Sequence, residues 1–325
     1  MASIKYKNNL IDSIYDKDYE FPQMVGVGIS YVCNADCIHC PYSKYKKAQD
    51  IVGREKFIDK NTFCKIVDEC VNYNTMIRIT GGGEPLLHPN VLELIGYAKR
   101  RNVRVALTTN GSLLDEDCIK ELLDSNIDAI EISVDAHNKE VYEKIRIGLH
   151  FEQIKDNVFN LVRMRNELFK KTSILVSIIN QKLIRKDLQD AVKFWEKIVD
   201  KVIIRKFIEI TLTKESDKKK NTNIICPYPF QRIYIDSSGT VRFCCYDIFG
   251  ETYMGNIKDD SLLNIWRSEK FNLWRSYLIN GDYEKIEICK KCNNIPYYSW
   301  NYNFFHALGD ALKNRGEKHE RTVIL

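Results

Sequence analysis

Short runs of hydrophobic residues recur along the chain between Val25 and Phe207. The runs are rich in valine and isoleucine and are bounded by polar or turn-forming residues, which is typical of buried strands in a parallel sheet. Six of them predict strands, at residues 25–30, 76–80, 104–108, 129–133, 173–179 and 202–207.

The segments between these strands carry hydrophobic residues at helical spacing. In the longest, Phe151, Ile154 and Val158 recur at steps of three and four residues, which places them on one face of a helix. Helices are predicted at residues 61–73, 89–101, 115–125, 151–168 and 185–199. Alternating strands and helices predict an α/β fold, in which a parallel sheet is covered by helices and the functional site lies at the carboxyl ends of the strands.

The pattern changes after residue 210. Residues 213–223 are charged and aperiodic, which predicts an exposed linker. Residues 232–236 and 240–243 alternate around Gly239, which predicts a β-hairpin. We therefore expect a lead segment, an α/β domain and a small C-terminal domain, at residues 1–22, 23–210 and 211–325.

Composition and charge narrow the class of protein. The chain has 325 residues and a formal net charge of +5, a balance that calls for neither nucleic acid nor an anionic membrane as a partner. Residues 1–20 carry no secretory signal, and no uncharged apolar stretch approaches the roughly 18 residues of a membrane span. We therefore expect a cytoplasmic protein. Its eleven cysteines favour metal chemistry over disulfide bonds.

Three cysteines, Cys33, Cys37 and Cys40, follow the first predicted strand. They are close enough in sequence for their thiolates to converge on one metal centre. Iron–sulfur clusters are held by cysteine thiolates, usually four for each cluster, so a loop that offers three would leave one iron open to a substrate. Structural zinc usually takes two Cys-x2-Cys pairs or two Cys and two His. The spacing therefore favours an iron–sulfur cluster, with zinc as the alternative.

A glycine-rich stretch, Gly81-Gly82-Gly83-Glu84, follows the second predicted strand. Together with the cysteine triplet it resembles the radical S-adenosylmethionine (SAM) superfamily. The resemblance implies a partial (β/α)6 barrel and a [4Fe–4S] cluster on the three cysteines, whose open iron chelates the methionine moiety of SAM. It also implies that the glycines and Glu84 line the amino group of SAM, which agrees with the close backbone approach that glycine permits. An electron donor such as flavodoxin or ferredoxin is implied as a partner.

Further contacts with SAM are expected near the ends of other strands. The resemblance implies a polar residue beside the SAM ribose, for which Ser133 and Asp135 are the candidates, with Thr109 after the third strand. Arg146 resembles an arginine that neighbours the SAM carboxylate in relatives with auxiliary clusters. The alternatives are a helix cap for Asp135, a turn after Thr109 and a surface position for Arg146. His39 stands where the family usually has an aromatic residue, although its backbone can still serve the adenine edge.

A second group of cysteines lies in the C-terminal part of the chain. Four thiolates can close one site, and structural zinc would satisfy the same ligand set. The spacing of these cysteines around Gly239 and Gly255 resembles the SPASM extension in its shorter form, called twitch, which implies one auxiliary [4Fe–4S] cluster. Its expected ligands are Cys226, Cys244, Cys289 and Cys292.

The other cysteines have less specific predictions. We interpret Cys245 as a buried thiol, with a substitute ligand and a hydrogen-atom donor as alternatives, and it is the one weak candidate for a catalytic residue. Cys64, Cys70 and Cys118 lie in helical patterns, where small core residues are expected. His306 is predicted to be structural.

The expected function is that of a radical SAM enzyme, which cleaves SAM to a 5′-deoxyadenosyl radical and abstracts a hydrogen atom from its substrate. Two reactions compete. One is oxidation of a sugar or cyclitol, with the auxiliary cluster as electron acceptor, which resembles radical SAM dehydrogenases of aminocyclitols. The other is epimerisation or cross-linking of a ribosomally made peptide. Thirty-two residues precede Cys33, too few for the leader-peptide-binding domain of many peptide-modifying relatives, so we favour a small-molecule substrate over a peptide. The non-enzymatic alternative is a metal-containing RNA-binding module. No residue identifies the general base.

Overall fold

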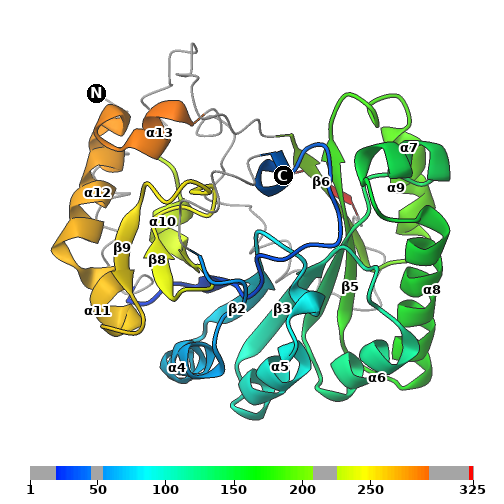
Figure 1. The fold of residues 1–325 in the computed structure, drawn as a ribbon, viewed down its shortest axis with the longest axis horizontal. Coiled ribbons are helices and arrows are strands. Elements are labelled where there is room, and N and C mark those ends of the chain that lie inside the picture. Colours follow the sequence, from blue (N-terminus) through cyan, green and yellow to red (C-terminus); the bar gives the residue numbers. More distant parts are fainter. Residues whose placement is uncertain (1–19, 45–53, 208–224, 293–321, 325) are drawn as a thin grey trace, which may run out of the picture.

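The computed structural model describes residues 20–44, 54–207, 225–292 and 322–324. Ten strands in these residues form one sheet (Figure 1). In sheet order they are β10 (Thr322–Ile324), β6 (Lys201–Lys206), β5 (Ser173–Asn180), β4 (Ala129–Ser133), β3 (Arg104–Thr109), β2 (Met76–Thr80), β1 (Met24–Gly28), β7 (Arg232–Ile235), β8 (Thr240–Arg242) and β9 (Tyr253–Asn256). Neighbouring strands from β10 through to β7 are parallel, whereas β8 and β9 continue the sheet as an antiparallel meander.

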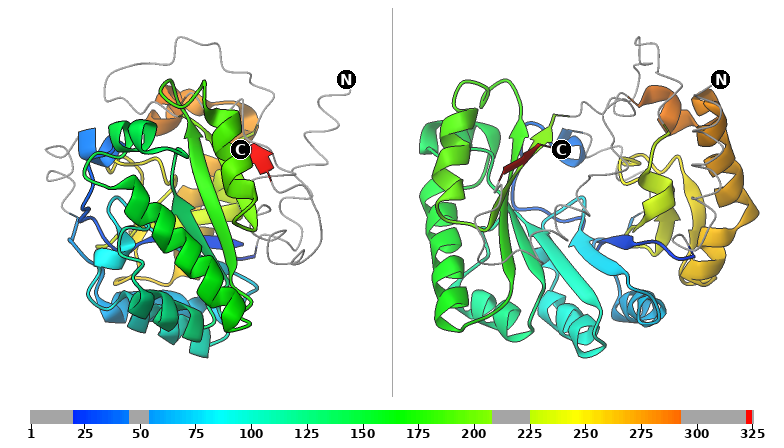
Figure 2. Two further views of the ribbon diagram at one scale, coloured as in Figure 1. Left: turned by 90° about the vertical axis from the view of Figure 1, so that its right-hand side faces the viewer. Right: turned by 180° about the vertical axis from the view of Figure 1, so that it is seen from behind.

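Helices cover the outer face of the parallel strands, and the sheet curves around an inner face that is open toward the C-terminal part (Figures 1 and 2). Each helix turns one apolar face to the sheet; in α8, Phe151, Ile154 and Val158 are buried. The helices are α4 (Lys60–Cys70), α5 (Val91–Arg100), α6 (Glu116–Asp124), α7 (Lys139–Ile145), α8 (Phe151–Glu167) and α9 (Leu188–Glu196).

A hydrophobic layer lies on the inner face near the amino ends of the strands. It consists of side chains that are at most 3% exposed and come from six neighbouring strands: Met24, Met76, Ala106, Ala129, Leu175 and Ile203. Arg78 and Glu131 follow Met76 and Ala129 of this layer by two residues, so these charged side chains lie nearer the carboxyl ends, where α/β proteins of this type place their functional sites.

The hydrophobic core continues into the C-terminal elements around the hairpin of β7 and β8. The Phe243 ring lies 5.1 Å from that of Phe271 and 5.2 Å from that of Trp274, and Trp266 lies 5.1 Å from Phe271. The helices of this C-terminal part are α10 (Tyr228–Gln231), α11 (Leu262–Arg267), α12 (Glu269–Asn280) and α13 (Glu287–Lys291), which lie together on one side of the molecule (Figure 1). Trp266 belongs to α11, and Phe271 and Trp274 belong to α12.

The predicted fold is confirmed in its class and in its order of elements. The six strands, the five helices and the hairpin all exist, with ends displaced by at most three residues. Nothing in the sequence pattern indicated α7, β9, α12, α13 or β10, or that β7 pairs with β1 and so makes the hairpin part of the main sheet. The predicted linker at residues 213–223 and His306 lie outside the described residues.

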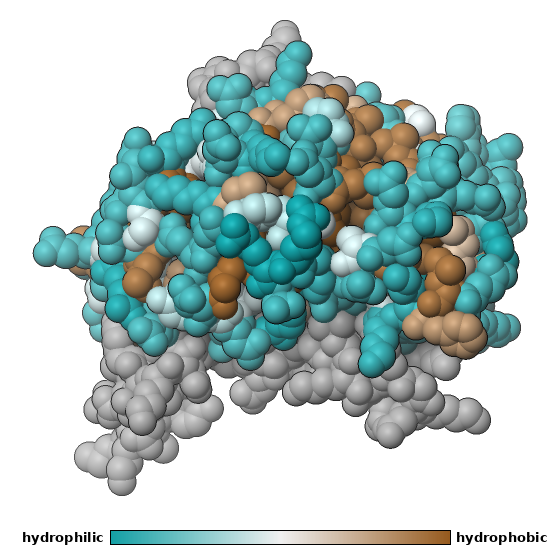
Figure 3. Space-filling model, turned by 90° about the horizontal axis from the view of Figure 1, so that it is seen from below, coloured by the Kyte–Doolittle hydropathy of each residue, from teal (hydrophilic) through white to brown (hydrophobic). Residues whose placement is uncertain are grey.

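No helix in the described part of the chain is long and apolar enough to cross a membrane. The face seen from below is mainly hydrophilic, with hydrophobic residues gathered toward its middle (Figure 3).

Candidate active site

The cysteine loop, residues 33–40, leaves the carboxyl end of β1 and is held against the end of α7. The Asp36 N–H donates to the Ile147 carbonyl oxygen at 2.8 Å, and the Ile38 N–H donates to that of Ile145 at 3.0 Å. A short helix, α2 (Pro41–Lys44), begins directly after the loop. Two backbone hydrogen bonds thus fix the loop at the edge where the strands end.

The glycine stretch packs directly against the segment that leads from β1 into the cysteine loop. A Cβ atom on Gly83 would lie 2.1 Å from the Val32 carbonyl oxygen, and one on Gly81 would lie 2.5 Å from that of Ser30. The Gly83 N–H also donates to the Ser30 carbonyl oxygen at 3.0 Å. Close approach to a ligand was the expected reason for these glycines. The structure gives Gly81 and Gly83 a further reason, which is that two backbone segments meet there.

The Glu84 carboxylate is buried at the end of the same stretch. It accepts hydrogen bonds from Thr109 Oγ1 at 2.6 Å, the Asn110 N–H at 2.7 Å and the Leu86 N–H at 3.1 Å. Burial raises the pKa of Glu84, although these three hydrogen bonds oppose the shift. A carboxylate has about four lone-pair positions, so three donors leave capacity for an ammonium group. That Glu84 binds the SAM amino group stays a prediction.

Asp135 and Arg146 form a buried ion pair beside the cysteine loop. Asp135 is fully buried and has a φ of 66°. Its Oδ2 accepts from Arg146 Nε at 2.9 Å and Nη2 at 2.7 Å, and its Oδ1 accepts from the Ile179 N–H at 2.6 Å. Two alternatives are therefore wrong: Arg146 is buried rather than at the surface, and Asn138, not Asp135, caps α7. A contact of Asp135 with the ribose stays a prediction.

His39 lies next to this ion pair. Its Nε2 is 3.7 Å from Asp135 Oδ2, and its Nδ1 is 3.3 Å from Gln181 Nε2. Burial lowers the pKa of His39 to about 4, so the ring is neutral near pH 7. A neutral ring can accept one hydrogen bond and donate another. The expected contact between the His39 backbone and adenine stays a prediction.

Two of the polar residues predicted to contact SAM, Thr109 at the end of β3 and Ser133 at the end of β4, have different surroundings. Thr109 is buried and bound to Glu84, and Gly111, with a φ of 82°, makes the turn that was the alternative there. Ser133 is half-buried and accepts a hydrogen bond from Ser177 Oγ at 3.5 Å. Ser133 therefore stays a candidate for the ribose, whereas Thr109 acts on Glu84.

The thiols of the first motif share one region with Arg146. Burial, with smaller contributions from Glu84, Cys37 and Cys40, raises the pKa of Cys33 to about 11, although a backbone hydrogen bond from Ala35 opposes the shift. Burial also raises the pKa of Cys37, but Arg146, whose Nη1 is 3.9 Å from Cys37 Sγ, opposes this. A loop with three thiols beside a guanidinium suits a soft, thiolate-binding metal centre, because metal binding supplies the charge that removes the thiol protons.

The second set of thiols comes from three separate elements. Cys226 lies before α10, Cys244 follows β8, and Cys289 and Cys292 lie in and at the end of α13. Burial raises the pKa of Cys226 to about 12, with a further contribution from Cys292. A hydrogen bond with Cys245 and burial raise the pKa of Cys244, and Cys226 and Cys292 raise it further. Cys226, Cys244 and Cys292, one thiol from each element, are therefore neighbours in space. That the four cysteines hold one cluster stays a prediction.

Neither set is already closed around a metal position. Across the described ranges, no three His, Cys, Asp or Glu side chains have the arrangement of metal ligands. The fit to iron–sulfur clusters thus rests on the donor chemistry and on the proximity of the thiols.

Cys245 is half-buried and packs against the core. Hydrogen bonds with the Cys244 thiol and the Tyr228 hydroxyl lower its pKa to about 7 against the opposite effect of burial, and Arg232 and Arg78 also favour the thiolate. The prediction of a buried thiol therefore describes Cys245 only in part, because its surroundings favour the reactive thiolate form. The roles of ligand and of hydrogen-atom donor stay as alternatives for Cys245.

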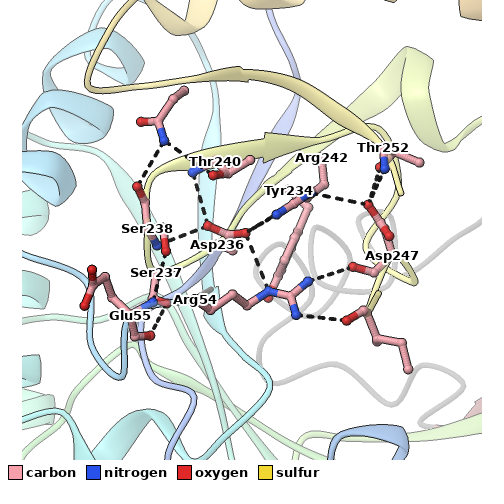
Figure 4. A network of polar contacts seen from close by, with 12 residues as sticks. Arg54, Glu55, Tyr234, Asp236, Ser237, Ser238, Thr240, Arg242, Asp247 and Thr252 are labelled. Carbon is pink, nitrogen blue, oxygen red and sulfur yellow. Dashed lines mark hydrogen bonds and ion pairs between the residues drawn. The ribbon is translucent and has the colours of Figure 1, made fainter. Parts of the chain in front are cut away.

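Arg54 ties the segment after the cysteine loop to the hairpin (Figure 4). Its guanidinium donates to the carbonyl oxygens of Ile248 at 2.9 Å and Asp247 at 3.0 Å, and its Nε lies 3.5 Å from Asp236 Oδ2. Asp236 also accepts from Arg242 Nη2 at 3.0 Å and so has two cationic neighbours. This network connects the surroundings of both cysteine sets, and nothing in the sequence alone indicated it.

A charged layer on the inner face of the sheet was also missed. Arg78 on β2 and Arg205 on β6 both pair with Glu131 on β4. Arg78 and Glu131 each interrupt a short strand that is mainly apolar and buried, and this departure from the usual composition of such strands was a signal that could have found them.

Comparison with known proteins agrees with this site. The model of the radical SAM superfamily matches residues 27–194, and that of SPASM, an iron–sulfur cluster-binding domain, matches residues 226–293. The chain belongs to the radical SAM superfamily and carries a SPASM region. The predicted cofactors follow from this membership: a [4Fe–4S] cluster with SAM, and auxiliary iron–sulfur ligation in the SPASM part.

Relatives found by sequence share low identity with this chain but match long stretches of it. The chain is 26% identical over 309 residues to the tungsten-containing aldehyde ferredoxin oxidoreductase cofactor-modifying protein of Pyrococcus furiosus, covering 79% of this chain and 84% of that protein. It is also 26% identical over 181 residues to the mycofactocin maturase MftC of Mycolicibacterium smegmatis, covering 56% of this chain and 44% of that protein.

Solved structures share the fold over most of the chain. BtrN in complex with AdoMet and 2-DOIA is 20% identical, with a TM-score of 0.59, covering 85% of this chain and 94% of that chain. Streptococcus suis SuiB bound to the precursor peptide SuiA is 13% identical, with a TM-score of 0.66 and coverage of 90% and 79%. Membership in an enzyme superfamily gives the RNA-binding alternative no support.

Proposed function

We propose that this radical SAM protein reductively cleaves SAM and removes a hydrogen atom from a hydroxyl-bearing small molecule, a sugar or a cyclitol, which is thereby oxidised. The observation that carries the proposal is the meeting of the cysteine loop, the glycine stretch and Arg146 at the carboxyl ends of the strands. The second thiol set is attached to the same sheet through β7 and β8.

The chain's own residues have distinct tasks in this proposal. Cys33, Cys37 and Cys40 would hold the first cluster, and the four thiols of the second set would hold one auxiliary cluster. When bound, SAM and its cluster supply a 5′-deoxyadenosyl radical, and the auxiliary cluster supplies an acceptor for one electron. Arg146 places a cation near the Cys37 sulfur, which stabilises the thiolate form. Glu84 offers its carboxylate to the SAM ammonium group.

The proposed oxidation converts a secondary alcohol into a ketone. The carbon-bound hydrogen leaves as an atom, the hydroxyl proton leaves to a base, and one further electron leaves to an acceptor. A one-electron reductant such as flavodoxin or ferredoxin must start each cycle. Support comes from the likeness to BtrN along nearly the whole length of that protein, whose solved structure is a complex with AdoMet and 2-DOIA.

Modification of a peptide is the second candidate, by epimerisation or cross-linking. It is favoured by the shared fold with SuiB bound to its precursor peptide SuiA and with anSMEcpe bound to AdoMet and the Cp18Cys peptide. The match to the mycofactocin maturase points in the same direction, although it spans less than half of that protein.

The test is hydrogen transfer into 5′-deoxyadenosine. Reduced protein with both clusters loaded is incubated with SAM and with carbon-deuterated sugars, cyclitols or peptides, and the deuterium content of 5′-deoxyadenosine is measured by mass spectrometry. We expect label from a sugar or cyclitol. Label that arrives only from a peptide would replace the first candidate by the second, and absence of 5′-deoxyadenosine with every substrate would refute the enzyme.

A further inference from the structure

The inner face of the sheet carries a charged layer above its hydrophobic layer. Arg78 Nη2 lies 2.9 Å from Glu131 Oε2, and Arg205 pairs with the other oxygen of the same carboxylate. The Thr108 hydroxyl also donates to Glu131 at 3.2 Å. Burial alone would raise the pKa of Glu131, but Arg205 and Arg78 lower it to about 2, so the carboxylate is ionised near pH 7.

Arg232, the first residue of β7, adds a third guanidinium to this region. In the sheet it pairs with Met24, so it belongs to the same face as the hydrophobic layer, and it is only 9% exposed. Its guanidinium carbon lies 5.0 Å from the centre of the Tyr228 ring. Its Nε is buried and finds no hydrogen-bond partner within the described ranges. A buried guanidinium donor without an acceptor is costly.

Arg78 is close enough to both of the other arginines for their charges to affect it. Burial lowers the pKa of Arg78, and Arg205 and Arg232 lower it further, because cations in a region of low dielectric repel each other. Arg78 and Arg205 both pair with the Glu131 carboxylate. Arg232, by contrast, keeps an open donor at its buried Nε. It acts on Arg78 and also lowers the pKa of Cys226 and Cys245, so it lies between the charged layer and the second thiol set, where an anion from outside the chain could accept this donor.

We propose that Arg232, with the charged layer of Arg78 next to it, binds an oxyanion of the substrate, either a carboxylate or a phosphate group. Guanidinium groups recognise both oxyanions through pairs of parallel N–H donors. Arg78 and Arg205 keep 16% and 26% of their side chains exposed, so an anion can reach this layer from solvent. The inference rests on the proposed function and makes the substrate class narrower: an acidic or phosphorylated sugar or cyclitol, rather than a neutral one or a cationic aminocyclitol.

Binding to three matched probes tests this without any turnover. Glucose, gluconate and glucose 6-phosphate differ mainly in charge and in the oxyanion present. Their affinities for the protein with both clusters and SAM bound are measured by calorimetry. We expect gluconate or glucose 6-phosphate to bind at least about tenfold more tightly than glucose, since a hydrogen bond to a charged group contributes about 1.5–3 kcal/mol. The stronger of the two anions identifies the oxyanion.

Two variants locate the anion. Arg232→Gln should weaken binding of the preferred anion about tenfold or more and leave glucose unchanged, whereas the matched control Arg163→Gln, on the outer surface of α8, should change neither. Iron content is measured for each protein. If Arg232→Gln loses iron, Arg232→Lys is scored instead; it keeps the charge without the paired donors and should weaken a planar carboxylate more than a phosphate.

The outcomes separate this inference from the proposed function. Equal affinity of wild-type protein for all three probes, or anion binding that survives both Arg232 substitutions, would overturn the oxyanion site even if deuterium reaches 5′-deoxyadenosine from a neutral sugar. Conversely, Arg232-dependent anion binding by a protein that forms no 5′-deoxyadenosine would keep the site and refute the reaction.

Discussion

Removing one partner of the buried pair between Asp135 and Arg146 should destabilise the protein strongly. In Arg146→Met, the Asp135 carboxylate keeps the Ile179 N–H but loses two guanidinium donors at 2.9 and 2.7 Å. It is fully buried, so water cannot replace them. Breaking a buried pair in this way costs about 3–5 kcal/mol.

That free energy converts into a change in melting temperature. A chain of 325 residues has an unfolding entropy of about 0.7 kcal/mol per kelvin, so the loss corresponds to a decrease of roughly 4–7 °C. The assay is differential scanning calorimetry of anaerobic, iron-loaded protein. Arg163→Met, which removes an exposed arginine of α8, should lower the melting temperature by less than about 1 °C.

The double variant Asp135→Asn/Arg146→Met separates the charge from the side chain's packing. It removes both charges, so it should melt above Arg146→Met although it carries one more substitution. If Arg146→Met itself melts within about 1 °C of the wild type, removing one partner of the buried pair does not cost several kcal/mol, and the prediction is refuted.

Three further predictions concern the clusters, the hairpin and the charged layer. Anaerobic reconstitution should give about eight irons per chain, falling to about four when Cys33, Cys37 and Cys40 are all replaced by Ala; zinc in the second site under ample iron would contradict this. Arg54→Met should lower the melting temperature by a few degrees and speed proteolysis within the hairpin, because two carbonyl acceptors and Asp236 lose a shared donor; unchanged proteolysis would exclude the coupling. The stabilising effect of Glu131 should be complete above about pH 4.5 and disappear as the pH falls toward 2, because the folded protein favours the ionised carboxylate and loses this contribution when the group is protonated. The difference in melting temperature between wild type and Glu131→Gln, measured on apoprotein, should therefore shrink below pH 4.5. A difference that stays constant with pH would count against this prediction.

The fold class followed from hydrophobic periodicity because most of its elements are local. The strand at Met76–Thr80 and that at Ala129–Ser133 were predicted with the bounds they have, since buried parallel strands are short, apolar and bounded by polar residues. Pairing between β1 and β7 is not local. No pattern within either strand states which partner it takes, so the continuity of the sheet could not be predicted.

Residues of the site also divide into those that local sequence signals predicted and those that depend on contacts between distant segments. The cysteines and the glycine stretch were found because their spacing is a sequence signal. Arg54, Asp236 and Arg232 were not, since their importance depends on residues far along the chain that only the fold brings near. Asp135 was found as a candidate, but its pairing with Arg146 required the end of β4 and the end of α7 to be adjacent.

The pairing of β1 with β7 also constrains the order of events while the chain is being made. β1 receives its second neighbour only when Arg232–Ile235 has left the ribosome, long after the cysteine loop itself has emerged. Contacts that close so large a loop form late and slowly. The strand that carries the first cysteine loop therefore gains its second neighbour only after residue 235 has been made, so insertion of iron before that point would meet a loop whose strand is paired on one side only.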